Sequence, residues 1–75
     1  MKEFVEYIVR SLVSDQQHVV VNVDEGDRTV EVRVNVAQED MGRIIGRRGR
    51  TVNSIRSLLR VLGSARDVRV ELDIE

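Results

Sequence analysis

The chain lacks cysteine and proline altogether, and it has no long apolar run. Without cysteine, neither a disulfide nor a thiolate metal site can stabilise the fold, and the absence agrees with a reducing compartment. The longest purely apolar run, Val19–Val21, is far shorter than the roughly 20 residues of a membrane span. We therefore expect a soluble, cytoplasmic protein in which residues 1–75 form one domain with a thin core, because so short a chain buries little of its surface.

Groups that support catalysis are also scarce. His18 is the only histidine, and the sequence places no obvious carboxylate partner beside it. The acidic residues Asp24, Glu25 and Asp27 fall in a predicted turn, where solvation explains them better than a metal site does. No Walker-type or dinucleotide-binding glycine pattern is present. The sequence thus predicts a protein that is not an enzyme and that uses no cofactor or metal.

Aromatic residues number only two, Phe4 and Tyr7, and both fall in the first predicted helix. The RRM and OB folds stack bases on aromatic side chains that their strands carry. A chain with no aromatic residue in a predicted strand does not fit either fold.

Positive charge is concentrated in one segment of the chain. Residues 41–66 contain seven arginines and no aspartate or glutamate, so this segment carries a charge of +7, whereas the other residues together carry −8. Such a distribution favours a localised anion-binding face, and the alternative is a basic helix face that is simply solvated. The seven are Arg43, Arg47, Arg48, Arg50, Arg56, Arg60 and Arg66.

The apolar residues follow helical spacing in some segments and alternate in others. Helical spacing predicts helices over residues 4–13, 41–45 and 50–62, and alternation or a valine run predicts strands over 18–24, 29–36 and 68–74. The first helix should stop near Ser14 and Asp15, and Gly63 should end the last helix. Gly42 would let the short second helix pack closely.

The order of these elements is αββααβ, which predicts an α+β fold. The first two strands should form an antiparallel hairpin, since only the turn at residues 24–27 separates them. The two helices before the last strand make a crossover, and such connections usually set neighbouring strands parallel. We expect a mixed three-stranded sheet with residues 29–36 in the centre and all three helices packed on one face.

Two glycines stand between the second and third predicted helices, in the stretch from Ile44 to Ile55 that reads IIGRRGRTVNSI. This stretch resembles the signature of the KH domain. That signature has two aliphatic residues, then Gly-x-x-Gly, then further aliphatic residues three and six positions after the second glycine. A helix and a strand ahead of the shared β-α-α-β core are similar to the type II arrangement. The resemblance covers essentially the whole chain and implies a type II KH fold.

The chemistry of the Gly46–Gly49 loop can be stated from its residues. Glycine has no Cβ, so the backbone can turn sharply and another backbone can approach closely. The helix that follows presents unsatisfied amides and a positive dipole end, and Arg47 and Arg48 add guanidinium donors. The sequence therefore predicts a clamp for a nucleic-acid backbone. The predicted RNA-binding residues are Arg43, Ile44, Ile45, Gly46, Arg47, Arg48, Gly49, Arg50 and Thr51.

An apolar groove beside this loop would take the bases. Ile44, Ile45 and Val52 are the nearest candidates for it. Core packing is the more frequent role of such side chains, and we assign it to Ile45, Val52 and Ile55.

The resemblance also implies a function. KH domains hold about four single-stranded nucleotides at this loop, and single-stranded DNA stays possible because nothing in the motif reads a 2′-hydroxyl. The chain is similar to the small bacterial single-KH proteins called KH-domain protein A, which act as RNA chaperones or post-transcriptional regulators. Their properties imply homodimerisation, heterodimerisation with a larger multidomain KH protein, and links to cell-envelope growth, cell shape and cell division.

A protein-interaction adaptor with little RNA binding of its own is the alternative function. Leu58 lies at the edge of the apolar face formed by the third predicted helix, and Val61 lies outside that face. These two residues could form a dimer seam, or they could belong to a wide buried stripe. The sequence leaves both possibilities open.

Overall fold

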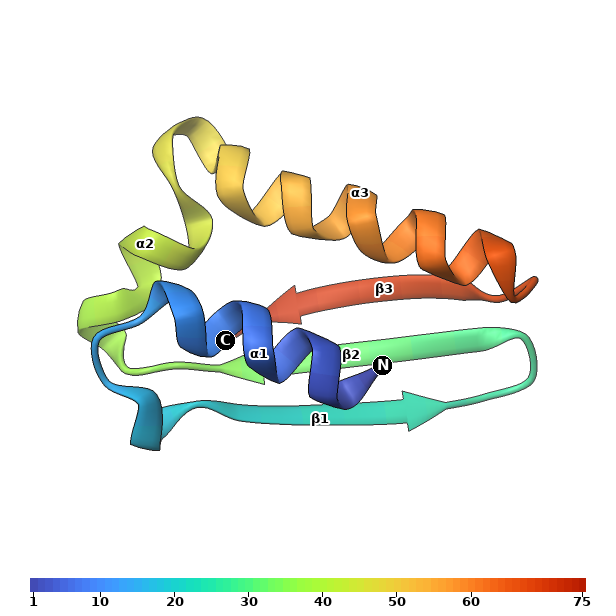
Figure 1. The fold of residues 1–75 in the computed structure, drawn as a ribbon, viewed down its shortest axis with the longest axis horizontal. Helices are drawn as coiled ribbons and strands as arrows, with labels where there is room; N and C mark the ends of the chain where they lie inside the picture. The colour runs from blue at the N-terminus through green and yellow to red at the C-terminus, as the bar shows by residue number, and fades with distance from the viewer.

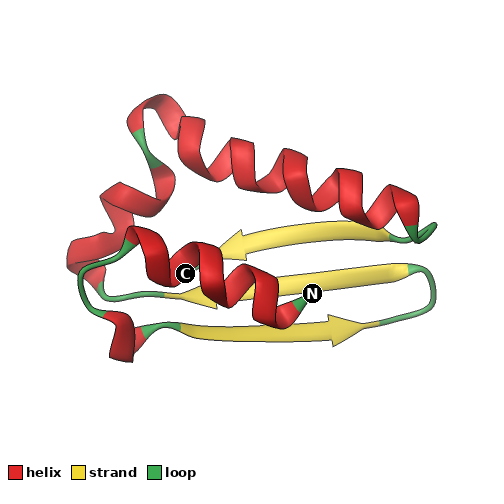
Figure 2. Ribbon diagram, in the orientation of Figure 1, coloured by secondary structure: helices red, strands yellow, loops and turns green.

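The computed structural model describes residues 1–75, and its element order is the predicted αββααβ (Figures 1 and 2). Single turns of 3₁₀ helix precede β1, α2 and α3. None of the helices combines the length and apolarity that crossing a membrane requires. The elements are α1 (Lys2–Leu12), β1 (Val20–Glu25), β2 (Thr29–Asn35), α2 (Met41–Ile45), α3 (Arg50–Ala65) and β3 (Arg69–Ile74).

The sheet has the predicted mixed topology, with the strand order β1-β2-β3. β1 and β2 pair antiparallel, and β2 and β3 pair parallel. Val32 in the central strand lies opposite Val23 of β1 and Leu72 of β3. Because the strands are in this register, their inward-facing apolar residues line one face of the sheet.

The core lies between that face and the helices. Val30, Val32 and Val34 are buried, while Glu31 and Arg33 between them are exposed. In Figure 1, α1 crosses the sheet over β1 and β2, and α3 runs along β3. The helices therefore cover one face, as predicted, and leave the other face polar. Fourteen residues form the core: Val5, Val9, Val13, Val19, Val21, Val30, Val32, Val34, Ile44, Val52, Ile55, Leu59, Val70 and Leu72.

Gly63 does not end α3 as predicted; it lies inside the helix and is buried. A Cβ on Gly63 would stand 2.6 Å from Cγ2 of Val70 and 2.7 Å from the backbone oxygen of Val68. The residue that takes the left-handed conformation after the helix is Asp67, with φ 58°. The N–H groups of Asp67 and Val68 donate to the carbonyls of Ser64 and Gly63, which is a Schellman closure. Gly63 thus serves close packing rather than termination.

Gly42 behaves in the opposite way. A Cβ built there would meet no atom within 4 Å, so the prediction that Gly42 lets α2 pack closely is wrong.

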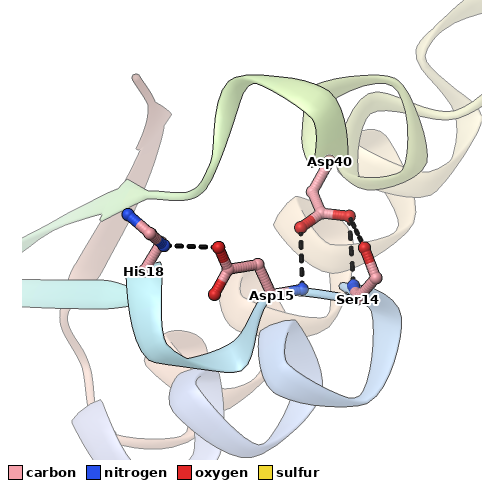
Figure 3. A network of polar contacts seen from close by, with 4 residues as sticks. All are labelled: Ser14, Asp15, His18 and Asp40. Atoms are coloured by element: carbon pink, nitrogen blue, oxygen red, sulfur yellow. Dashed lines mark hydrogen bonds and ion pairs between the residues drawn. The ribbon is translucent and has the colours of Figure 1, made fainter.

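Asp40 joins the end of α1 to the start of α2 (Figure 3). Its Oδ1 accepts hydrogen bonds from the backbone N–H of Ser14 at 3.0 Å and from the Ser14 hydroxyl at 2.8 Å, and its Oδ2 accepts from the N–H of Asp15 at 3.1 Å. Asp40 is only 1% exposed, yet all of these donors reach it. The carboxylate therefore satisfies two backbone amides just beyond α1 and fixes the position where α2 begins.

These contacts set the ionisation of Asp40. The hydrogen bond from the Ser14 backbone lowers the pKa of Asp40, with the Asp15 amide, the Ser14 hydroxyl and the Arg43 charge acting in the same direction and burial opposing them. Asp15 also pairs with Nδ1 of His18 at the surface (Figure 3). His18 therefore has a carboxylate partner, contrary to expectation, because a turn of 3₁₀ helix brings the two side chains together.

Substituting Gly63 by alanine will destabilise the fold. The added methyl must displace the backbone of Val68 or shift Val70, and overpacking of this kind costs about 1–3 kcal/mol. The free energy of unfolding in urea measures the effect. The Gly42→Ala variant is the matched control, because open space surrounds that position and alanine is the better helix former by about 1 kcal/mol. Equal stability of Gly63→Ala and the wild-type protein would contradict the close packing.

Substituting Asp40 by asparagine will lower stability at neutral pH, since an amide NH₂ would face backbone donors. The folded-state pKa of Asp40 lies below its unfolded value of about 3.9, so its contribution is complete above that value and disappears as the pH falls through the folded pKa. The difference between variant and wild type should therefore shrink in acid. Urea unfolding at several pH values measures this difference, with the exposed Asp73→Asn as control. A difference that is independent of pH would refute the assignment.

Candidate nucleic-acid interface

The segment between α2 and α3 is a tight chain reversal rather than a continuous helix. α2 ends at Ile45, Gly46 follows with φ 76° and ψ 175°, and Gly49 has φ 74° immediately before α3. Figure 1 shows this reversal projecting at one end of the molecule, away from the sheet. Arg47 and Arg48 are exposed at its tip. The loop therefore has the exposure that binding of a nucleic-acid backbone requires.

The two glycines serve different purposes. A Cβ on Gly46 would stand 2.2 Å from Oγ1 and 2.8 Å from the backbone nitrogen of Thr51, so no side chain fits there. At Gly49 the nearest such contact is 3.5 Å, to Nδ2 of Asn53, and the left-handed backbone is what favours glycine. Thr51 closes the loop by packing onto Gly46, which is a structural contact that the sequence did not indicate.

Arg48 adopts the left-handed conformation as well, with φ 56°. Non-glycine residues take this conformation at a cost, and such residues concentrate at binding and catalytic sites. Arg47 and Arg48 lie between α2 and α3, outside both helices. Neither guanidinium forms an ion pair or a hydrogen bond within the protein.

The remaining arginines near the loop differ in whether their side chains have partners within the protein. Arg43 and Arg50 are exposed on either side of the reversal, although the charge of Arg43 also acts on Asp40. Arg56 is engaged, because it donates from Nε and Nη2 to the carbonyl of Leu72 and from Nη1 to Oδ1 of Asn53. The loop arginines together with Arg43 and Arg50 form the local excess of positive charge.

The roles expected for the two isoleucines are reversed. Ile44 is fully buried in the core, and Ile45 is 39% exposed beside the loop. Ile44 is therefore not available to contact a base, whereas Ile45 is. Val52 and Ile55 lie in the core as expected. The sequence could not assign the two isoleucines, since α2 has only five residues and shows no full period of apolar spacing.

The side of α3 away from the core carries a row of exposed apolar residues, the α3 apolar stripe, formed by Leu58, Val61 and Leu62. They are 42%, 66% and 37% exposed. Leu59, next to this stripe, is buried in the core, whereas Leu62 is not. Leu62 lies at the rim of the buried face of α3 because Gly63, rather than Leu62, packs on β3.

Comparisons with known proteins identify a family that matches nearly the whole chain. The family model described as KhpA/KhpB, KH domain, matches residues 2–74. The curated relatives include several proteins named RNA-binding protein KhpA. The protein of Chlamydia pneumoniae is 42% identical and covers 99% of this chain and 95% of its own length. The protein of Borreliella burgdorferi is 43% identical over 96% and 88%, and that of Listeria monocytogenes serovar 1/2a is 38% identical over 99% and 97%.

No solved structure gives a significant match to the chain. The family assignment rests on the sequence matches, and the αββααβ fold with its mixed sheet is consistent with it. The match of the family model to residues 2–74 and the near full-length relatives lead to one conclusion: the chain belongs to the KhpA/KhpB KH-domain family.

Proposed function

We propose that this protein binds single-stranded RNA and that the Gly46–Gly49 loop holds the RNA backbone. The observation that carries the proposal is the exposed pair Arg47 and Arg48, which has no partner within the protein and sits directly before the N-terminus of α3. Amides of a helix N-terminus and guanidinium groups both bind phosphate oxygens. The relatives named RNA-binding protein KhpA support RNA as the ligand.

The bases would lie beside the loop, where Ile45 offers exposed aliphatic surface. A site of this kind grips the backbone through charge and reads sequence only modestly. The proposed activity is that of a binding module, not an enzyme. Chaperone activity on RNA, post-transcriptional regulation and the links to cell-envelope growth stay predictions of the resemblance.

A second proposal concerns self-association. The α3 apolar stripe is exposed, and a two-fold related copy of the same helix would cover it in an isologous interface. The same stripe would serve for pairing with a larger KH protein. Because the loop precedes the N-terminus of α3 and the stripe lies in the second half of that helix, dimerisation and RNA binding are compatible.

Replacing both Arg47 and Arg48 by aspartate will weaken binding to a labelled oligouridine by at least about tenfold, since two charged hydrogen-bonding groups are lost and repulsion replaces them. Aspartate tolerates the left-handed backbone at position 48, so the circular dichroism spectrum should not change. Fluorescence anisotropy measures the affinity.

The matched control is the double variant Arg10→Asp and Arg33→Asp, which makes the same change in net charge on α1 and on the polar face of the sheet. Normal affinity in the loop variant would remove the loop from the mechanism. An equal loss in the control would show that overall charge, rather than the loop, is responsible. Oligothymidine of the same length tests whether DNA is bound equally well.

Replacing Leu58 and Val61 together by glutamine will convert a dimer into a monomer without unfolding it, because both side chains are exposed in the single chain. Light scattering across a dilution series gives the mass. The Tyr7→Gln variant removes an exposed apolar residue from α1 and should leave the mass unchanged. A wild-type protein that stays monomeric at high concentration would rule out the dimer.

A further inference from the structure

A second arginine-rich surface lies between α3 and β3, toward the end of α3 that is remote from the glycine loop. It is a groove of about 800 Å³. Figure 1 shows the turn from β1 to β2 and the turn from α3 to β3 at this same end of the molecule. Four arginines from three parts of the chain line the groove: Arg28 of the hairpin turn, Arg56 and Arg60 of α3, and Arg69 of β3.

The groove carries an excess of positive charge. Asp67 and Glu71 are the only acidic residues that line it, and Glu71 pairs with Arg69 at 3.6 Å. The guanidinium groups of Arg28 and Arg60 form no ion pair or hydrogen bond within the protein. Two arginines are therefore free to bind an external anion.

The backbone holds Arg28, which lines the groove, next to the start of β3. Arg28 has φ 65°, and its carbonyl oxygen accepts a hydrogen bond from the N–H of Arg69 at 2.8 Å. This contact fastens the hairpin turn to the start of β3. The position of Arg28 relative to β3 is thus set by the fold rather than by a mobile turn.

One polar side chain, Asn53, lies between this groove and the glycine loop. Asn53 lies beside Gly49, 3.5 Å from the position that a Cβ would take there. Asn53 accepts a hydrogen bond at 3.3 Å from Nη1 of Arg56, which lines the groove. The polar surface therefore continues from the loop into the groove along one side of α3.

The spacing along α3 suits a nucleic-acid strand. Arg56, Arg60 and Ser64 follow each other at intervals of four residues, which is about 6 Å along the helix axis. The apolar stripe lies on nearly the opposite side of the helix, since successive residues are about 100° apart. A strand in the groove would therefore not compete with a second protein chain on the stripe.

We propose that the groove binds the continuation of the RNA strand that the glycine loop holds, with Arg28 and Arg60 each contacting one phosphate beyond the roughly four nucleotides of the loop site. This inference rests on the proposed function, because it assigns the groove to the same strand. The continuity through Asn53 and Arg56 favours one strand over a separate ligand.

The test measures affinity against oligouridine length, from four to ten nucleotides, for the wild type and the double variant Arg28→Asn and Arg60→Gln. Asparagine tolerates the left-handed backbone at position 28. Both proteins should bind the tetranucleotide equally, and the variant should bind the octanucleotide about tenfold more weakly. Its slope of log affinity against log salt on the octanucleotide should be shallower by about 1.4, since each phosphate contact contributes roughly 0.7.

The control variant, Arg10→Gln and Arg33→Gln, removes the same charge away from the groove and should match the wild type at every length. The single variant Arg28→Asn changes a residue outside α3, so it separates an effect on RNA binding from an effect on dimerisation through α3. Its slope of log affinity against log salt should be shallower than that of the wild type by about 0.7. Light scattering confirms the mass of each variant.

The outcomes separate the two claims. One outcome is that the wild type binds through the loop while the groove variant gains affinity with oligouridine length in the same way as the wild type. In that case the groove is not part of the RNA site, and only this inference fails. If the Arg47→Asp and Arg48→Asp variant binds oligouridine normally at every length, the proposal that the loop holds the RNA backbone fails, and the assignment of the groove to the continuation of that strand fails with it.

Discussion

The close approach of α3 to β3 at Gly63 is the constraint on which the rest of the molecule depends. With no Cβ at this position, the helix lies directly against Val68 and Val70, and the Schellman closure at Asp67 turns the chain at once into β3. Because β3 pairs with the central strand, α3 is fixed relative to the whole sheet. The loop at one end of α3 and the surfaces on its two sides therefore have defined positions.

The structure separates the groups that stabilise the fold from the groups that are free to bind. The core consists almost entirely of aliphatic side chains, and the one buried charge, Asp40, is satisfied by amides and a hydroxyl near the end of α1. The loop arginines, by contrast, have no partner. The positive charge is concentrated because residues 41–66 carry +7 and the other residues −8, so the net charge is only −1.

Much of the candidate site could be predicted because it depends on local sequence. The Gly46–Gly49 loop, its arginines and the helix that follows are continuous in the chain. The predictions of which isoleucine is buried, Ile44 or Ile45, were wrong because α2 is too short to show a period of apolar residues. The prediction that Gly63 ends the last helix was wrong because glycine signals a helix end far more often than close packing. The ion pair between His18 and Asp15 depends on a single turn of 3₁₀ helix, which the spacing of apolar residues does not predict.

The sequence alone determined the order of the elements, the strand that lies in the centre and the place of the chain reversal, because apolar periodicity and glycine spacing encode these features locally. Tertiary structure decided which residues of α3 face β3, how the hairpin turn is joined to β3 through Arg28, and which arginines remain unpaired. These properties arise from contacts between segments distant in the chain, and no local pattern of residues records them.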